Sequence, residues 1–331
     1  MMQHISLVTG GGGFIGSHVA QHLLTLNHKV IILDDLSGGF ETNVPKGCTF
    51  VKGSITNEDL VNSIFEQYNF DYVYHLAAYA AEGLSHFIRK FNYENNLIGS
   101  INLINASVNH NVKRFIFTSS IAVYGTQELP LKESQKPQPE DPYGIAKYAV
   151  EMDLKNAYKM FGLDYTIFRP HNVYGPGQNI GDKYRNVVGI FMNQILKGES
   201  LTIFGDGLQS RAFTYIDDVA PYIASSYAFA KAKNKTFNIG SDTESTVSAL
   251  ATEVGKAMKA TININHLDQR EEVVHAYSDH TLFKKVFSPK NETLLSKGLS
   301  ETAAWVQKHG ARESSTFEPI EIIKNLPKSW Q

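Results

Sequence analysis

Cysteine is almost absent from this chain of 331 residues, which contains only Cys48. One thiol cannot close a disulfide within the chain, and it excludes a zinc site built on several thiolates, so no metal site is expected. An excess of charge is also missing, because 31 basic residues face 33 acidic ones and no block of like charges occurs. This balance predicts no nucleic-acid partner and no membrane partner, and any bound phosphate must be held by a few placed groups.

Long apolar runs are missing as well. None reaches the ~18 residues that a membrane-spanning helix needs. The first residues, Met1–His4, show no charged segment followed by an apolar one, so no secretory signal is expected and a cytoplasmic location is predicted. With 42% apolar and 19% charged residues, the composition is that of a globular chain. Its length predicts one large α/β unit with a smaller region appended.

Short apolar runs alternate with longer helical patterns in the first half of the chain. Several runs, such as Val30–Leu33, are continuously apolar, which is typical of strands covered on both faces of a parallel sheet. Strands are predicted at 5–9, 29–34, 49–52, 72–77, 114–119 and 165–169, and helices at 17–26 and 94–110. The alternation predicts right-handed crossovers and an α/β fold with a Rossmann-type, doubly wound parallel sheet of about seven strands.

After Pro170 the pattern loosens. Gly175-Pro176-Gly177 breaks the chain, a helix is predicted at 187–197, and a last strand at 236–240 is expected to rejoin the first sheet. We therefore expect the second, smaller mixed α/β domain to interrupt the first. The larger domain would comprise residues 1–170 with about 211–250, and the smaller one about 171–210 with 251–331.

A glycine-rich stretch at residues 9–18, TGGGGFIGSH, joins the first predicted strand to a helix. Gly11, Gly13 and Gly16 fit the pattern G-x-G-x-x-G, and Gly10, Gly13 and Gly16 fit G-x-x-G-x-x-G. Such a loop turns tightly, lets a pyrophosphate approach closely and presents N–H groups at a helix N-terminus. The alternative is a flexible turn that binds nothing.

The second predicted strand ends in Asp34-Asp35, eighteen residues beyond Gly16. A carboxylate there can accept hydrogen bonds from both hydroxyls of an adenosine ribose, and it would repel a 2′-phosphate. Because no arginine follows within the next several residues, the pattern predicts NAD rather than NADP, with Asp34 as the contact. A solvated turn carboxylate is the alternative for Asp34, and the role of Asp35 stays open.

Tyr143 and Lys147 lie four residues apart in a predicted helix, one crossover after a strand that ends in Ser119-Ser120. Residues at this spacing share a helix face. The ammonium, aided by a positive nicotinamide ring, is expected to lower the pKa of the tyrosine from ~10 toward neutrality. Such a tyrosine can take a proton from a secondary alcohol while hydride leaves its carbon, with a serine positioning the same oxygen. The bare pair is otherwise a common solvated helix face.

Nine motifs in this order resemble the extended short-chain dehydrogenase/reductases, the nucleotide-sugar epimerases and dehydratases, over nearly the whole chain. They are TGGGGFIGSH (9–18), DDLSGG (34–39), HLAA (75–78), NNLIGS (95–100), TSSIAVYG (118–125), YGIAK (143–147), RPHNVYGP (169–176), GDGLQSRAFTYIDDV (205–219) and FNIGS (237–241). The resemblance implies the sheet order 3-2-1-4-5-6-7. It also implies that the larger domain binds NAD and that the smaller one binds the nucleotide sugar.

The resemblance implies roles for individual residues. Tyr143 matches the catalytic base, Lys147 its partner, and Ser120 the catalytic serine, with Ser119 as the second candidate. The implied cofactor-binding residues are Gly10, Gly13, Phe14, Ile15, Gly16, Asp34, Ser54, Ile55, Leu76, Ala77, Ala78, Asn95, Tyr143, Lys147 and Pro170. The implied substrate-binding residues are Asn172, Asn186, Arg211 and Arg270. One departure is Gly53-Ser54, where the family usually has Gly-Asp facing the adenine amine, so the adenine contact is expected to differ.

The residues after Ser120 bear on the reaction. Dehydratases and decarboxylases of the family carry an acid just before Val-Tyr-Gly, and the 3,5-epimerases carry a cysteine at the position of Ala122, whereas this chain has Ile121-Ala122. The resemblance therefore implies 4-epimerisation of a nucleotide sugar, with a UDP-hexose favoured, through a transient 4-keto sugar. The alternatives are another nucleotide-sugar epimerase (GDP-mannose 3,5-epimerase-like), a decarboxylase or dehydratase, a small-alcohol dehydrogenase, and a non-catalytic NAD-binding protein.

The segment Tyr79–His86 is unusual for a 4-epimerase and is expected to border the sugar. Glu82, Ser85 or His86 could supply a further acid or base, or the segment could be a surface loop with one buried side. His171 is interpreted as a packed imidazole beside the nicotinamide, with a proton donor as the alternative. Helices near 94–109 and 143–161 resemble the pair that forms a four-helix bundle in family dimers, so a homodimer is expected.

Overall fold

The structure is a computed structural model that describes residues 3–269, 273–290, 292–313, 317–327 and 330. Its centre is a seven-stranded sheet in the order β3-β2-β1-β4-β5-β6-β11, and every neighbouring pair is parallel. The strands are β1 (Ile5–Thr9), β2 (Lys29–Asp34), β3 (Thr49–Lys52), β4 (Tyr72–His75), β5 (Arg114–Thr118), β6 (Tyr165–Pro170) and β11 (Lys235–Ile239). The doubly wound sheet and its order are confirmed.

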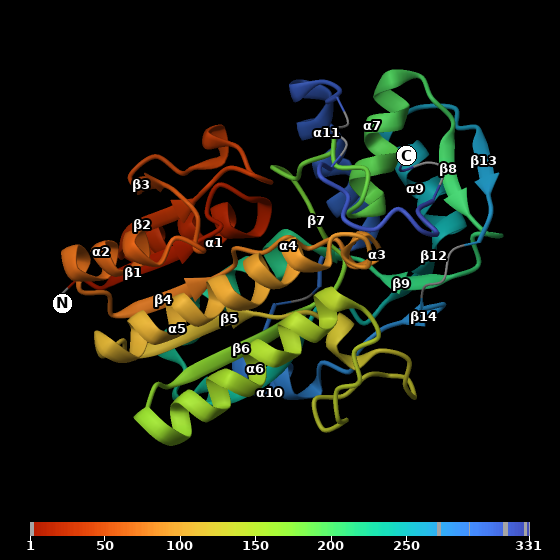
Figure 1. Ribbon diagram of the computed structural model, residues 1–331. Coiled ribbons are helices and arrows are strands. Elements are labelled where there is room, and N and C mark those ends of the chain that lie inside the picture. The colour runs from red at the N-terminus through yellow and green to blue at the C-terminus, as the bar shows by residue number, and fades with distance from the viewer. Residues whose placement is uncertain (1–2, 270–272, 291, 314–316, 328–329, 331) are drawn as a thin grey trace.

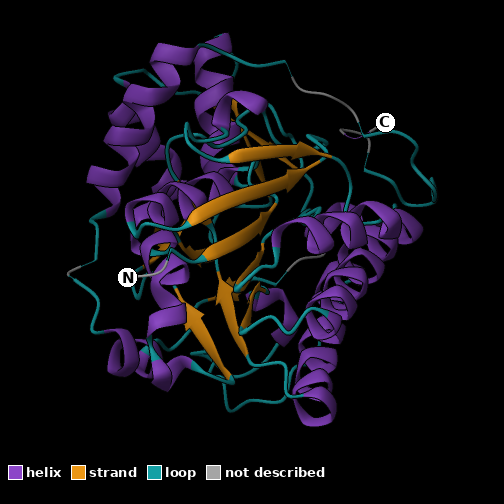
Figure 2. Cartoon of the chain, turned by 90° about the vertical axis from the view of Figure 1, so that its left-hand side faces the viewer, coloured by secondary structure: helices purple, strands orange, loops and turns teal. Residues whose placement is uncertain are grey.

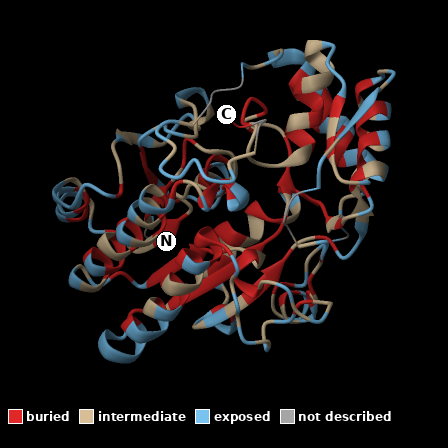
Figure 3. Cartoon of the chain, turned by 45° about the vertical axis from the view of Figure 1, so that its right-hand side comes forward, coloured by how far each residue is buried: buried red, intermediate tan, exposed pale blue. Residues whose placement is uncertain are grey.

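Helices cover both faces of this sheet (Figures 1 and 2). One face packs against α1 (Phe14–Thr25), α8 (Ala220–Ser225) and α10 (Thr281–Phe287), and the other against α2 (Glu58–Tyr68), α5 (Gly99–Asn109) and α6 (Pro142–Phe161). Neighbouring strand residues serve opposite faces, since Val8 packs with the first group and Leu7 with the second. Burial on both sides explains the continuous apolar runs, and the strands are accordingly buried in Figure 3.

Two predicted strands are shorter than expected, because β4 ends at His75 and β5 at Thr118. The chain leaves the sheet there to border a cavity. The helix predicted at 94–110 begins earlier, with α4 (Arg89–Tyr93), and continues through a π-helical turn (Glu94–Ile98) into α5. Such turns are frequent at functional sites.

Smaller sheets and the helices α7 (Val187–Lys197), α9 (Val247–Met258) and α11 (Leu295–His309) form most of the remaining described structure. Strands β7 (Val173–Tyr174) and β10 (Thr214–Tyr215) pair, as do β8 (Leu201–Phe204) and β13 (Ile264–Leu267). Strands β12 (Glu244–Thr246), β9 (Ser210–Ala212) and β14 (His275–Ala276) form a third small sheet. Within the described residues, no helix has the length and apolar character to cross a membrane.

The division into two domains stays a proposal, with one difference. Helix α10, which the proposed boundaries place in the smaller domain, packs against β11 and β6 of the large sheet. The ring of Phe287 lies 5.2 Å from that of Phe237 and 5.8 Å from that of Phe168. The short sequence between β14 and α11 therefore returns to the larger domain.

Candidate active site

A cavity of about 1120 Å³ lies at the carboxyl ends of the large sheet's strands. The residues that line it come from the glycine loop, from the start of α6 and from the smaller sheets. Parallel sheets bind ligands at this edge, because their loops and helix N-termini converge there. The glycine loop and Tyr143 thus border one continuous space, as an enzyme that couples them requires.

Close backbone contacts explain the glycines of the loop. Gly10 has φ +73°, and a Cβ there would lie 2.6 Å from the backbone nitrogen of Ala77. A Cβ on Gly16 would lie 2.1 Å from the carbonyl oxygen of Gly10. Gly13 precedes the first turn of α1, where free N–H groups and the helix dipole favour an anion. The loop fits the pyrophosphate of a dinucleotide.

Asp34 closes β2 beside this loop. Its carboxylate accepts hydrogen bonds from the N–H groups of Gly12 (2.9 Å) and Leu36 (2.7 Å). Burial raises the pKa of Asp34, and these hydrogen bonds act in the opposite direction. Both Asp34 and Asp35 line the cavity, but Asp35 is exposed and accepts from the N–H of Ser37 (2.8 Å). The two oxygens of Asp34 are thus oriented and retain lone pairs for the two ribose hydroxyls.

The remaining residues assigned to the cofactor follow the same cavity. Those lining it are Phe14, Ile15, Ser54, Ile55, Leu76, Ala77, Ala78, Asn95 and Pro170. Ser54 stands where the family usually has aspartate, and its hydroxyl lies 2.9 Å from that of Thr56. Asn95 lies in the π-helical turn and donates to the carbonyl of Phe91 (2.9 Å). The chain therefore brings these predicted positions together.

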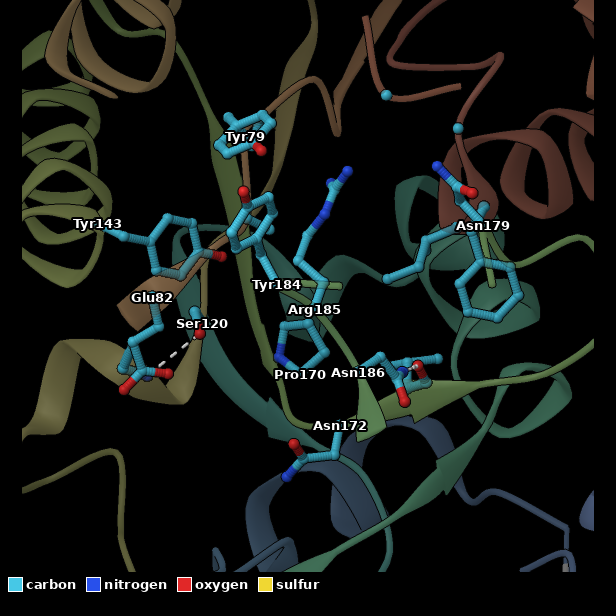
Figure 4. A pocket seen from close by; sticks show the side chains of 18 of the residues that line it. Tyr79, Glu82, Ser120, Tyr143, Pro170, Asn172, Asn179, Tyr184, Arg185 and Asn186 are labelled. Atoms are coloured by element: carbon cyan, nitrogen blue, oxygen red, sulfur yellow. Dashed lines mark hydrogen bonds between the residues drawn. The ribbon is translucent and has the colours of Figure 1, made fainter. Parts of the chain in front are cut away.

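Tyr143 and Lys147 occupy the first two turns of α6. Asp141 caps this helix by accepting from the N–H of Gly144 (2.9 Å), and Pro142 starts it. The hydroxyl of Tyr143 points into the cavity (Figure 4). The ammonium of Lys147 lies 5.8 Å from the centre of the Tyr143 ring and donates to the carbonyl of Thr118 (2.8 Å).

The expected lowering of the tyrosine pKa is wrong for the protein alone. Burial raises the pKa of Tyr143, and the hydrogen bond with Ser120 only partly opposes it. Burial also lowers the pKa of Lys147 to about 7, against the attraction of Glu151. Removal from water disfavours both charged forms, and here it outweighs the lysine's proximity. The charge of Arg185 also lowers the pKa of Tyr143 without overcoming burial, and the positive nicotinamide ring of bound NAD⁺ would add a further charge that favours the phenolate.

The two serines at the end of β5 have different surroundings. Ser119 is buried and donates to the carboxylate of Glu151 (2.6 Å), which also accepts from Arg169 (2.8 Å). Ser120 lies at the start of a 3₁₀ helix (Ile121–Tyr124) and accepts from the N–H of Ala122 (3.1 Å). The hydroxyl of Ser120 lies beside that of Tyr143, whereas the hydroxyl of Ser119 serves the buried carboxylate.

The segment Tyr79–His86 borders the cavity and contains a short helix, α3 (Glu82–Ser85). Ser85 donates to the carbonyl of Glu82 (2.6 Å) and accepts from the N–H of Tyr143 (3.2 Å). Ser85 therefore joins α3 to the start of α6. Glu82 lines the cavity close enough to Tyr143 for its charge to raise the phenol's pKa. A carboxylate thus faces the site, as one interpretation of this segment expected.

Comparison with known proteins places this geometry in a family. Residues 6–240 match the NAD dependent epimerase/dehydratase family. The chain belongs to this family. It is 31% identical to the UDP-glucose 4-epimerase of Mycolicibacterium smegmatis over 90% of this chain and 96% of that protein.

Two solved structures of epimerases resemble more than nine tenths of the chain, each at 34% identity. The UDP-glucose 4-epimerase of Thermotoga maritima, with UDP-glucose, gives a TM-score of 0.88 over 92% of this chain and 99% of that one. The UDP-N-acetylglucosamine 4-epimerase of Methanobrevibacter ruminantium, with UDP-N-acetylmuramic acid, gives 0.87 over 93% and 100%. The NAD dependence of the family agrees with the fit of the glycine loop and Asp34.

In this epimerase/dehydratase, three of the four predicted substrate residues line the cavity. Asn172 (φ +42°) and Asn186 (φ +47°) both adopt left-handed backbone conformations. The guanidinium of Arg211 donates to the carbonyl of Val274 (2.8 Å) and also to that of Val273. Arg270 lies outside the described residues.

His171 fits the interpretation as a packed imidazole. It is buried, its Nδ1 lies 3.0 Å from the carbonyl oxygen of Ala212, and its Nε2 lies 3.0 Å from Nε2 of His280. Because Nδ1 must donate to a carbonyl, Nε2 accepts from His280. Burial lowers the pKa of His171 to about 3, so the ring is neutral near pH 7 and no imidazolium is available as a proton donor.

Several side chains at the cavity were missed by the sequence analysis. They are Tyr184, Arg185 and Trp330. Arg185 forms an ion pair with Asp182 and lies 5.0 Å from the centre of the Tyr79 ring. Figure 4 shows Tyr79, Tyr184 and Arg185 beside Tyr143. No motif marks these positions, because their approach to the site depends on the fold of the loops.

Proposed function

We propose that this chain is a nucleotide-sugar 4-epimerase, with a UDP-hexose as substrate. The observation that carries the proposal is the shared cavity, in which Tyr143 and Ser120 face the space that continues to the glycine loop. The names of the relatives described above support the choice of reaction. NAD held by the glycine loop and Asp34 would supply the acceptor and donor of hydride that the reaction needs.

The residues of the chain would then handle the proton and the position of the sugar. Tyr143 takes the proton from O4, Ser120 orients the same oxygen, and Lys147 adds positive charge behind the phenol. The resulting 4-keto sugar turns about its diphosphate link, which Asn172 and Arg211 are placed to hold. Tyr143 returns the proton to O4 after the hydride reaches the opposite face of C4.

A dehydratase or a 3,5-epimerase is the second candidate, because Glu82 lies near Tyr143. Both reactions must move a proton from carbon as well as the one from O4, and Glu82 is a carboxylate in the cavity. Ile121 and Ala122 offer no acid at the position that the family's dehydratases use. We favour the 4-epimerase because it requires only the groups already aligned.

The expected result with UDP-glucose is the formation of UDP-galactose up to a fixed ratio of the two sugars, without net NADH absorbance. Separation of the nucleotide sugars by chromatography and the absorbance of NADH measure both quantities. The same reaction in D₂O should leave carbon-bound protons of the product unexchanged. Accumulating NADH would indicate a dehydrogenase, and deuterium at C5 would indicate the second candidate.

We also propose a homodimer formed through α6 and the π-helical turn. Large apolar side chains are exposed on both elements, with exposed fractions of 53% for Ile98, 40% for Ile145 and 55% for Met152. These elements pack side by side, and exposed apolar patches mark protein interfaces. A charge in the middle of such an interface must lose its water on association.

Met152→Glu should therefore raise the dissociation constant of the dimer by roughly 10²-fold, or about 2.7 kcal/mol. Sedimentation velocity over a range of concentrations measures this change. Leu208→Glu, which places the same charge at an equally exposed residue outside α6, should sediment like the wild-type protein. A dimer of unchanged affinity in Met152→Glu would exclude this interface.

A further inference from the structure

The C-terminal tail, taken as the described residues 317–327 and Trp330, packs against the first half of the chain (dark blue in Figure 1). Glu321 fixes it there. The two oxygens of this carboxylate accept from the N–H groups of Lys90 (2.7 Å) and Phe91 (2.8 Å), at the first turn of α4. The N–H groups of Glu321 and Ile322 donate to the carbonyl of Phe87 (2.9 and 3.2 Å). A carboxylate at a helix N-terminus satisfies free N–H groups and is favoured by the helix dipole.

Aromatic side chains extend this contact toward the cavity. The ring of Phe317 lies 5.0 Å from that of Tyr79 and 4.9 Å from that of Phe91. The N–H of Phe317 donates to the hydroxyl of Tyr184 (3.2 Å). The tail therefore packs on two segments that border the active site, one before α4 and one before α7.

Trp330 completes this aromatic cluster. Only 5% of its surface is exposed, and its ring lies 5.2 Å from that of Tyr184 in an edge-to-face arrangement. The indole also covers Gly83, where a Cβ would come within 3.2 Å of it. Gly83 follows Glu82, whose charge reaches Tyr143. The indole thus lies beside the segment that borders the reacting phenol.

Trp330 lies at a different part of the cavity from the residues assigned to the adenosine and to the diphosphate. Asp34 marks the adenosine end, and Arg211 marks the end assigned to the diphosphate. Trp330 lines the same cavity, and its ring packs beside Gly83, Phe87 and Tyr184, of which Gly83 directly follows Glu82. An aromatic wall at this place can cover the C–H face of a pyranose, which leaves the hydroxyls for polar partners such as Glu82.

We infer that Trp330 forms the wall on which the sugar ring of the substrate packs, so that the C-terminal tail determines affinity for the sugar. This inference rests on the proposed function. Trp330 is a specificity-determining residue in this account, and it takes no part in proton transfer. It should act on the sugar moiety, because its ring packs beside Gly83, next to Glu82 and the segment that borders Tyr143.

A fluorescence titration tests the contact between Trp330 and the sugar through binding, without a measurement of turnover. The chain has two tryptophans, Trp305 and Trp330, so Trp305→Phe leaves Trp330 as the only indole. Trp305 lies on α11 and stacks on His309 (4.2 Å between ring centres). UDP-glucose and UDP-galactose should change the tryptophan emission of this variant, and the change should saturate as the concentration of nucleotide sugar rises. UDP alone should change it little, because it lacks the sugar that covers the indole.

Kinetics of Trp330→Ala test the same contact in the complete enzyme. The KM for the nucleotide sugar should rise by about tenfold, the order expected for a lost stacking contact, with kcat within threefold. Inhibition by UDP and the content of bound NAD should be unchanged. Trp330→Phe should recover most of the affinity. Ile323→Ala changes an exposed tail residue (79%) and should behave like the wild-type protein.

The outcomes separate this inference from the proposed function. Equal emission with UDP and UDP-hexoses, together with an unchanged KM in Trp330→Ala, would overturn the role of Trp330 while epimerisation stands. A change in emission that requires the sugar, without interconversion of the two UDP-hexoses, would support the contact between Trp330 and the sugar. It would contradict the proposal that the protein is a 4-epimerase. A rise in the inhibition constant of UDP equal to the rise in the KM of the nucleotide sugar would also contradict the inference, since the loss of affinity would then not depend on the sugar.

Discussion

Tyr143→Phe should lower the turnover of UDP-hexoses by roughly 10²-fold or more while NAD remains bound. The change removes one oxygen, which points into the cavity beside the hydroxyl of Ser120 (Figure 4). It leaves the ring and its packing at the start of α6. The phenol is the group placed to take the O4 proton, and Ser119, whose hydroxyl is held by Glu151, is poorly placed to replace it. Chromatography of the nucleotide sugars and the absorbance of extracted NAD measure the two effects.

Tyr79→Phe is a matched control for this variant. It also removes one phenolic oxygen from a tyrosine that lines the same cavity. Because Tyr79 packs against Phe91 and Phe317, its role is that of a wall, and we expect less than fivefold loss of turnover. If Tyr143→Phe kept wild-type turnover, the assignment of the base would be refuted. If it lost NAD as well, the change would have disturbed binding rather than proton transfer.

The fold and the cofactor end of the site could be predicted from the sequence because their determinants are local. Burial of each strand on both faces leaves a continuous apolar run, as at Val30–Leu33. The left-handed backbone of Gly10 and the contact of Gly16 with Gly10 arise within one loop, and Asp34 ends the next strand. The first two strands and the loop between them therefore indicate both the fold and the binding of a dinucleotide.

The sugar end could not be predicted in the same way, because it is assembled from distant segments. The family resemblance favours Ser120 over Ser119, but the physical reason, a hydrogen bond from Ser119 to Glu151 across 32 residues, appears only in the structure. The tail reaches the cavity through Glu321, whose partner Lys90 is 231 residues away. The pKa of Tyr143 depends on burial, which no spacing of tyrosine and lysine reveals. Contacts of this kind follow from the packed fold alone.

The buried ion pair between Glu151 and Arg169 leads to the largest expected effect on stability. Both side chains are almost fully buried, and Arg169 lies 4.6 Å from the centre of the Tyr124 ring. Glu151→Leu would leave a guanidinium that stays protonated at all usual pH values without its counter-charge. Such a change costs about 3–5 kcal/mol, so the melting temperature should fall by roughly 10 °C. Differential scanning calorimetry at neutral pH measures the shift.

The double variant Glu151→Leu/Arg169→Met separates the unpaired charge from the loss of packing. With both charges gone, no ion remains to be desolvated, and apolar side chains of similar size can fill the space between α6 and β6. We expect the double variant to regain most of the melting temperature lost by Glu151→Leu. A double variant as unstable as the single one would mean that packing and the hydrogen bond from Ser119 dominate. Recovery would show that Glu151 is required chiefly because Arg169 is buried beside it. The ion pair would then support the end of β5, where Ser119 donates to Glu151 and Ser120 lies beside Tyr143.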